Sequence, residues 1–175
     1  VEIRDLDTGQ IVKHIWVVKA WNLLQMEQVA DLNGNGAPEL AILREHPEDN
    51  WVSVQPMDTA SGSRFRSLGF DPNYRPVRLR VLDDINGNGY EEIAVLAVRR
   101  GCCNQKVWVK DTKTGQSIQR VFFGKQHIGI DMDISPDING NGTPELVVLG
   151  QRDDGVLRAI IKDSKTGEFI SSVGF

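Results

Sequence analysis

Oxygen-bearing side chains recur at a fixed spacing in three short loops of this chain. The first loop reads Asp-Leu-Asn-Gly-Asn-Gly from Asp31, and the pattern returns 53 residues later at Asp84 and again 53 residues later at Asp137. A glutamate follows eight residues after each first aspartate, so oxygens stand at loop positions 1, 3, 5 and 9. Carboxylate and amide oxygens on a tight turn are suitable ligands for a hard cation such as Ca²⁺. The spacing therefore indicates a cation site in each loop.

Two interpretations of these loops remain open. In the first, each loop binds Ca²⁺ through two carboxylates, with an affinity on the order of 10⁻⁴–10⁻³ M, the range of extracellular modules. Mg²⁺ fits less well, because it requires near-octahedral geometry and keeps its waters. In the second, Asn-Gly is a metal-free turn whose side chains bond the loop's own amides. An EF-hand is excluded, because position 12 is apolar in all three loops: Ile42, Val95 and Val148.

The other reactive residues form no catalytic pattern. The histidines His14, His46 and His127 fall at different repeat positions, and the sequence contains no nucleophile elbow or phosphate loop. The adjacent pair Cys102 and Cys103 has no metal-ligand spacing and is either a vicinal disulfide or two free thiols. We therefore expect no catalytic residues and no organic cofactor.

The elements that position the loops are expected to be strands. A second turn alternates with the loops and opens at Asp5, Asp58, Asp111 and Asp163. In the middle repeat, residues 77–81 alternate apolar and charged residues, as a half-exposed strand does, whereas residues 93–98 are continuously apolar, as in a buried strand. Residues 106–110 and 117–122 complete a unit of four strands, and only residues 22–30 leave the choice between helix and strand open.

The repeat predicts an all-β fold of four-stranded antiparallel blades of the β-propeller type. The chain holds about three and a half repeats of 53 residues, so we expect a partial propeller or an open array. As one repeat domain (1–175), it divides into a half blade (1–18), blade 1 (22–70), blade 2 (76–123) and blade 3 (128–175). Uncovered end surfaces predict self-association, or further repeats that complete the ring.

The loop between two strands, repeated once per four-stranded unit, resembles the FG-GAP/VCBS repeats of integrin-α-like propellers and of bacterial surface and secreted proteins. The Phe-Gly signature of that family is degenerate here, with only Phe123-Gly124 similar to it, and this chain has Asn, Asn and Glu where family loops often carry Asp. The resemblance implies calcium bound by side chains at positions 1, 3, 5 and 9 and by the main-chain carbonyl at position 7. It nominates Asp31, Asn33, Asn35, Ala37, Glu39, Asp84, Asn86, Asn88, Tyr90, Glu92, Asp137, Asn139, Asn141, Thr143 and Glu145.

The charge and hydrophobicity of the sequence limit the kinds of partner that we expect this chain to bind. A net charge of −4 argues against a nucleic-acid partner, and no apolar run is long enough to span a membrane. Residues 64–120 nevertheless hold eleven Lys and Arg against six Asp and Glu, which is either a solvated face or an anion-binding patch. Trp108 is expected in the core between blades, and Trp51 is either buried or an exposed platform for a sugar ring.

Three functions are compatible with these features. The first, which we favour, is a calcium-binding module for extracellular or surface binding and adhesion, with an unknown protein or carbohydrate ligand. The family resemblance implies an extracellular, cell-surface or periplasmic location, although the chain begins without a signal-peptide pattern. The second is a structural spacer with metal-free turns. The third is a fragment of a propeller enzyme that processes polysaccharides.

Overall fold

The computed structural model describes residues 1–17 and 19–175, and these residues form fourteen β-strands. Val18, the last residue of the predicted half blade, lies outside the described residues. Within the described ranges, no helix is long and apolar enough to cross a membrane. The strands are β1 (Glu2–Arg4), β2 (Ile11–His14), β3 (Asn22–Val29), β4 (Glu39–Glu45), β5 (Val52–Asp58), β6 (Leu68–Phe70), β7 (Tyr74–Leu82), β8 (Glu92–Arg99), β9 (Gln105–Asp111), β10 (Ser117–Phe122), β11 (Ile128–Ser135), β12 (Glu145–Gln151), β13 (Leu157–Asp163) and β14 (Phe169–Gly174).

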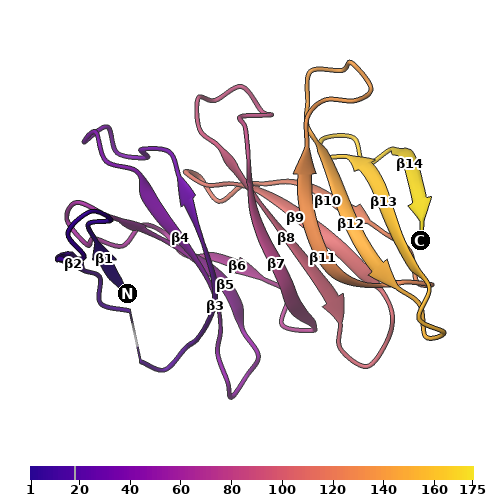
Figure 1. The fold of residues 1–175 in the computed structure, drawn as a ribbon, viewed down its shortest axis with the longest axis horizontal. Helices are drawn as coiled ribbons and strands as arrows, with labels where there is room; N and C mark the ends of the chain where they lie inside the picture. The colour runs from indigo at the N-terminus through magenta and orange to yellow at the C-terminus, as the bar shows by residue number, and fades with distance from the viewer. Residues whose placement is uncertain (18) are drawn as a thin grey trace.

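Twelve of the strands form three antiparallel sheets of four strands, each in sequential order, and β1 pairs with β2 in a hairpin. We call the sheets blade 1 (β3–β6), blade 2 (β7–β10) and blade 3 (β11–β14). In Figure 1 they follow one another in a row, from the indigo hairpin at one end to the yellow strands at the other. The predicted fold class, all-β with propeller-type four-stranded blades, is confirmed.

The first strand of each blade packs beside the first strand of the next, so β3, β7 and β11 are neighbours. Each of these strands carries an irregularity at the same repeat position, between Leu23 and Gln25, between Pro76 and Arg78, and between Gly129 and Asp131. A bulge of this kind increases the local twist of a strand. Residues 22–30, whose pattern did not separate helix from strand, contain the first of these strands, β3, which ends at Val29.

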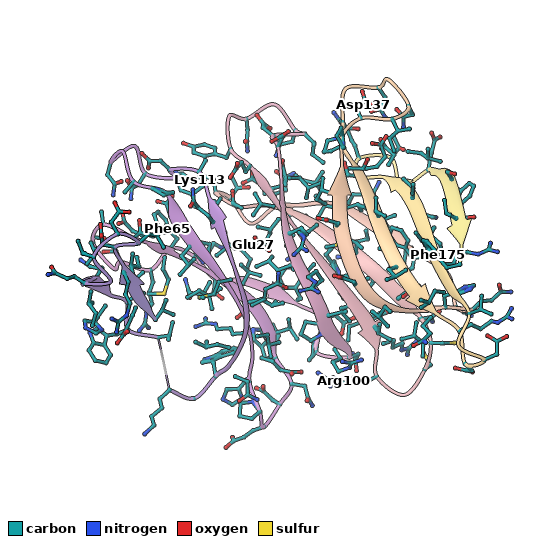
Figure 2. All side chains as sticks on the ribbon, in the orientation of Figure 1. Glu27, Phe65, Arg100, Lys113, Asp137 and Phe175 are labelled. Carbon is teal, nitrogen blue, oxygen red and sulfur yellow. The ribbon has the colours of Figure 1, made fainter. Side chains whose placement is uncertain are left out.

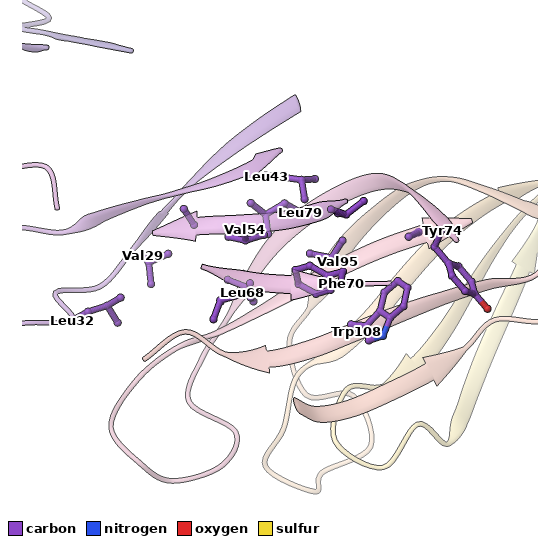
Figure 3. Close-up of a cluster of buried hydrophobic side chains, with 14 residues drawn as sticks. Val29, Leu32, Leu43, Val54, Leu68, Phe70, Tyr74, Leu79, Val95 and Trp108 are labelled. Atoms are coloured by element: carbon purple, nitrogen blue, oxygen red, sulfur yellow. The ribbon is translucent and has the colours of Figure 1, made fainter. Parts of the chain in front are cut away.

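The hydrophobic core lies between blades, as stacked sheets require. One cluster joins blades 1 and 2 (Figure 3), a second joins blades 2 and 3, and a smaller one joins the hairpin to blade 1. In the first cluster, the indole of Trp108 meets the rings of Phe70 and Tyr74 edge to face, with centroids 5.8 and 5.1 Å away. Trp108 is 4% exposed, so its predicted place in the core between blades is confirmed.

Burial along the strands follows the patterns in the sequence. All six apolar residues from Ile93 to Val98 in β8 are buried, because this strand lies inside its sheet and both faces are covered. Tyr74–Leu82 of β7 mixes buried and half-buried positions, as a strand with one accessible face does. Cys102 and Cys103 follow β8 in a turn and are two free thiols.

Candidate metal loops

The three loops predicted to bind a cation lie along one edge of the row of blades. Each joins the first strand of a blade to the second, and all three rise at the upper edge in Figure 1, where Figure 2 labels Asp137. The strands on either side are equivalent in the three blades, so the fifteen nominated residues fall into three equivalent sets.

The aspartate at loop position 1 accepts bonds from the loop's own backbone. Asp31 Oδ1 accepts the N–H of Gly34 at 2.7 Å, and Oδ2 accepts the N–H of Gly36 at 2.6 Å. Asp84 and Asp137 accept the equivalent amides at 2.6–2.7 Å. The amide at position 6 is the largest cause that lowers the pKa of each of these aspartates. Both glycines of the first loop have positive φ, 78° and 85°, which glycine adopts at little cost.

The glutamate at position 9 opens the second strand and faces another buried carboxylate. Glu39 pairs directly with Asp58 across β4 and β5, and the equivalent glutamates pair with Asp111 and Asp163 in the other blades. All six side chains are 0–2% exposed. Residues directly opposite on antiparallel strands have Cβ atoms about 4.5–5.5 Å apart, and like charges there are destabilising. Each blade thus places two acidic groups side by side beneath its loop.

The loop asparagines rest on the aspartate of this pair. In blade 1, Asn33 Nδ2 and Asn35 Nδ2 each donate to Asp58 Oδ2 at 2.5 Å. In blade 2 the corresponding distances to Asp111 are 3.2 and 2.5 Å, and in blade 3 those to Asp163 are 3.5 and 2.6 Å. The amide oxygens of the loop accept backbone N–H groups instead, as Asn35 Oδ1 does from Ala37 at 2.8 Å. The asparagines therefore link the loop to the turn between the third and fourth strands.

The glutamate oxygens are satisfied differently in the three loops. Glu39 Oε2 accepts the N–H of Leu32 at 2.7 Å, but its Oε1 is buried and has no hydrogen-bond partner among the described residues. In blade 2, Glu92 Oε1 accepts Asn86 Nδ2 at 2.6 Å. In blade 3, both oxygens of Glu145 share the N–H of the residue that follows the first aspartate. In the first loop, Glu39 Oε1 is therefore a buried carboxylate oxygen that has no hydrogen-bond partner among the described residues, on the residue directly opposite Asp58.

In blades 1 and 2, the carboxylates of the loop influence one another's protonation. Burial, with the nearby charges of Asp84 and Asp111, raises the pKa of Glu92 to about 7. Burial also raises the pKa of Glu39, with smaller contributions from Asp31 and Asp58. In contrast, burial alone would raise the pKa of Asp111, but bonds from Thr114 and the loop asparagines outweigh it, and the net shift is downward. In blades 1 and 2, each loop therefore combines two aspartates whose pKa is lowered with one glutamate whose pKa is raised.

Acidic groups alone do not complete a metal site here. Within residues 1–17 and 19–175, no three His, Cys, Asp or Glu side chains lie close enough together to hold a metal ion. A cation in these loops would also need the asparagine oxygens and main-chain carbonyls, which are the remaining members of the nominated sets.

The turn after the third strand of each blade is part of the site, which the loop motif alone did not predict. Asp58, Asp111 and Asp163 open the turn that follows the third strand, and they were interpreted only as turn residues. The signal that could have found them is the period itself, since they follow the first loop aspartate by 27, 27 and 26 residues. Thr59 strengthens the connection, because its Oγ1 donates to the carbonyl of Pro38 at 2.5 Å.

Comparison with known proteins identifies the fold alone. No family model matches the chain, and no curated protein matches it. Among solved structures, the crystal structure of the exotype rhamnogalacturonan lyase YesX is similar, with a TM-score of 0.59 at 14% sequence identity. The similarity covers 99% of this chain but 35% of that one, so the chain spans about a third of the lyase's length. At this identity the match supports the arrangement of blades and does not identify an activity.

Proposed function

We propose that the chain is a calcium-binding repeat module of the propeller type that serves binding or adhesion outside the cell and is not itself catalytic. The observation that carries this proposal is the pair of buried carboxylates beneath each loop, Glu39 with Asp58 in blade 1. Burying two like charges is costly unless a cation or hydrogen bonds compensate them. A divalent cation supplies that compensation.

The donor set fits calcium better than other common metals. Carboxylate, amide and carbonyl oxygens are hard ligands, and Ca²⁺ takes six to eight of them in flexible geometry. Asp58 places a further carboxylate directly beside Glu39, and the asparagine oxygens and main-chain carbonyls of the loop would supply the remaining ligands. The free Oε1 of Glu39 is an acceptor that a cation would satisfy. The ammonium group of Lys113 also contacts this loop, since its Nζ donates to the carbonyl of Leu32.

A spacer with metal-free turns is the second candidate, and a specific observation favours it. Each first aspartate already accepts amide N–H groups, and each loop asparagine already bonds both a backbone amide and a buried aspartate. The loops thus have internal partners for most of their polar atoms. Two features still favour a bound cation in the loops. They are the unpaired Glu39 Oε1 and the electrostatic cost of placing two buried carboxylates side by side.

A third candidate is part of a larger polysaccharide-processing protein. The similar crystal structure is that of a rhamnogalacturonan lyase, and this chain matches about a third of it. A module of this kind could belong to such an enzyme without holding the reacting groups. We rank it below the binding module because the fold alone supports it.

Thermal unfolding in millimolar Ca²⁺ and in chelator tests the proposal. A ligand that binds only the folded state at ten times its Kd stabilises by about 1.4 kcal/mol per site, so three sites should raise the melting temperature clearly. Mg²⁺ at the same concentration is the matched control and should have a smaller effect. Superimposable curves in Ca²⁺ and chelator would leave the metal-free spacer.

A further inference from the structure

Two pockets of the molecule are the same feature repeated in consecutive blades. One, of about 360 Å³, lies where β9 and β10 of blade 2 meet the end of blade 1, and the other, of about 580 Å³, lies where β13 and β14 of blade 3 meet the end of blade 2. Lys106, Trp108 and Lys110 line the first, and Arg158, Ile160 and Lys162 occupy the equivalent strand positions in the second. We call them groove 1 and groove 2.

Groove 1 holds its lysines against aromatic rings. Lys106 is 8% exposed, and its Nζ lies 3.8 Å from the ring centroid of Tyr74 and 4.3 Å from that of Trp108. Lys110 Nζ lies 4.8 Å from the ring centroid of Phe70 and donates to the carbonyl of Gly69 at 2.7 Å. Cation–π contacts fix these ammonium groups without neutralising them. Two charged donors are therefore preset in the wall of the groove.

The cations of both grooves outnumber their counter-ions. In groove 1, Lys106, Lys110 and Arg120 face one carboxylate, Asp71, whose Oδ2 lies 3.9 Å from Lys106 Nζ. Burial and the nearby charge of Arg120 lower the pKa of Lys110, as expected where like charges converge. Groove 2 is lined by Lys125, Arg158 and Lys162, with no carboxylate among its described lining residues.

Three of these cations have neither a hydrogen-bond partner nor an ion-pair partner in the described part of the chain. Among residues 1–17 and 19–175, the side chains of Arg120, Arg158 and Lys162 form no hydrogen bond and no ion pair. The chain as a whole carries a net charge of −4, so unpaired cations gathered in two pockets are not a consequence of composition. The equivalent positions of β5 in blade 1 are Ser53, Gln55 and Met57, which carry no charge. The charged strand positions that line the grooves are therefore a feature of blades 2 and 3 and are not shared by blade 1.

Each groove also offers an accessible aromatic ring. Trp51 is 46% exposed at the edge of groove 1, and its indole lies so close to Gly69 that a Cβ there would come within 2.8 Å of the ring. Glycine at this position thus leaves room for the indole to lie against the backbone while nearly half of the side chain stays exposed. Phe169, in groove 2, is 61% exposed. Aromatic faces provide apolar platforms, and such platforms beside charged donors suit ligands with both an apolar face and a negative charge.

We propose that grooves 1 and 2 bind an acidic oligosaccharide, with sugar rings stacked on Trp51 and Phe169 and carboxylates held by the lysines and arginines. This inference rests on the proposed binding function and names its ligand class. A nucleic acid also stacks and carries charge, but an acidic chain with a pI of 5.4 lacks the basic footprint of nucleic-acid binders. Grooves on consecutive blades would let one polymer chain occupy both, which increases affinity through multivalency.

Calorimetry on the whole chain with hexagalacturonate tests the proposal, and its fully methyl-esterified form is the probe of equal length without charge. We expect the acid to bind and the ester to bind much more weakly. Added salt should lower the affinity of the chain for the acid. Trp51→Ala should reduce affinity about 3- to 10-fold, by loss of stacking. Arg120→Gln should reduce it about two- to fivefold, by loss of one exposed charge.

Control variants outside the grooves test whether binding is specific to them, and a calcium series separates the grooves from the calcium sites. Trp16→Ala removes a tryptophan that is 79% exposed elsewhere, and Arg75→Gln removes an exposed arginine outside both grooves; neither should change binding. Equal binding of acid and ester, no binding of either, or stronger binding of oligothymidylate would overturn the proposal. Saccharide binding that persists without any effect of Ca²⁺ on melting would refute the calcium sites alone, and a calcium effect without saccharide binding would refute the grooves alone.

Discussion

Glu27 and Arg80 stand at the same position of consecutive repeats, and their side chains form an ion pair between two blades, with Oε1 and Nη1 3.0 Å apart. Arg80 Nε also lies 3.0 Å from Oδ1 of Asp133, the next residue in this series. The position therefore carries charges of alternating sign along β3, β7 and β11. Identical residues would repel, so the difference between repeats ties each blade to its own neighbour.

We expect Arg80→Gln to lower the free energy of unfolding by about 1 kcal/mol, since two partly exposed ion pairs are lost and each contributes little. Urea unfolding followed by circular dichroism measures the change. Arg75→Gln, an exposed arginine on the same strand, is the control and should leave the midpoint almost unchanged. Equal effects of the two variants would mean that the charge series does not hold the blades together.

Arg78 and Asp131 make a second contact between blades, with Nε and Oδ1 2.5 Å apart. The bond from Arg78 is the largest cause that lowers the pKa of Asp131 below its usual value of 3.8. A folded-state pKa below the unfolded one gives stability that is present above the unfolded pKa and is lost as the pH falls through the folded value.

Asp131→Asn should therefore be less stable than the parent at about pH 7, and the difference should shrink as the pH falls below 3.8 and through the lowered pKa of the folded state. Urea midpoints of the two proteins across this range measure it. A difference that stays constant with pH would show that packing of the side chain, and not its charge, provides the stability.

The blades were predictable from the sequence because their signals are local. Alternation in residues 77–81, the apolar run 93–98 and the turn residues at Asp58 and Asp111 each specify one strand or turn. The site was only partly predictable. The pairing of Glu39 with Asp58 depends on the register of β4 and β5, which a single loop does not encode. The grooves depend on which strand of one blade covers the next, so the cations of groove 1 appeared in the sequence only as a charge bias, and those of groove 2 gave no signal.

Calcium stoichiometry separates the roles of the loop and of the second turn. Asp84→Ala removes a position-1 carboxylate and should reduce the calorimetric site count from three to two, because each blade has its own loop. Asp111→Asn should instead keep the loop but weaken the site of blade 2, since it removes the carboxylate that the loop asparagines contact.

Asp5→Asn is the matched control for Asp111→Asn. Asp5 accepts the N–H of Thr8 at 2.7 Å, as Asp111 accepts that of Thr114 at 2.5 Å, but no loop asparagine contacts Asp5 in the described structure. Calcium binding should be unchanged in the control. If Asp5→Asn and Asp111→Asn behave alike, the second turn contributes only to folding, and an unchanged count in Asp84→Ala would remove that residue from the ligand set.

The last blade predicts self-association of the 175-residue chain. Among the described residues, strand β14 pairs only with β13, contains no charged residue or proline, and exposes Val173 at 50%, followed by Phe175 at 76%. An apolar, uncharged edge strand is a template for pairing with another chain. Two copies joined edge to edge through β14 would form a two-fold dimer.

Light scattering at micromolar concentration measures this association, and we expect a mass near twice 19.5 kDa. Ser171→Lys places a charge at an exposed position of β14 and should shift the chain to monomer, because lysine on an edge strand blocks pairing. Lysine at Gln116, an exposed turn position away from β14, is the control and should leave the dimer intact. A parent chain that stays monomeric over a wide concentration range would contradict the prediction, and a Ser171→Lys variant that still dimerises would move the interface to the hairpin end.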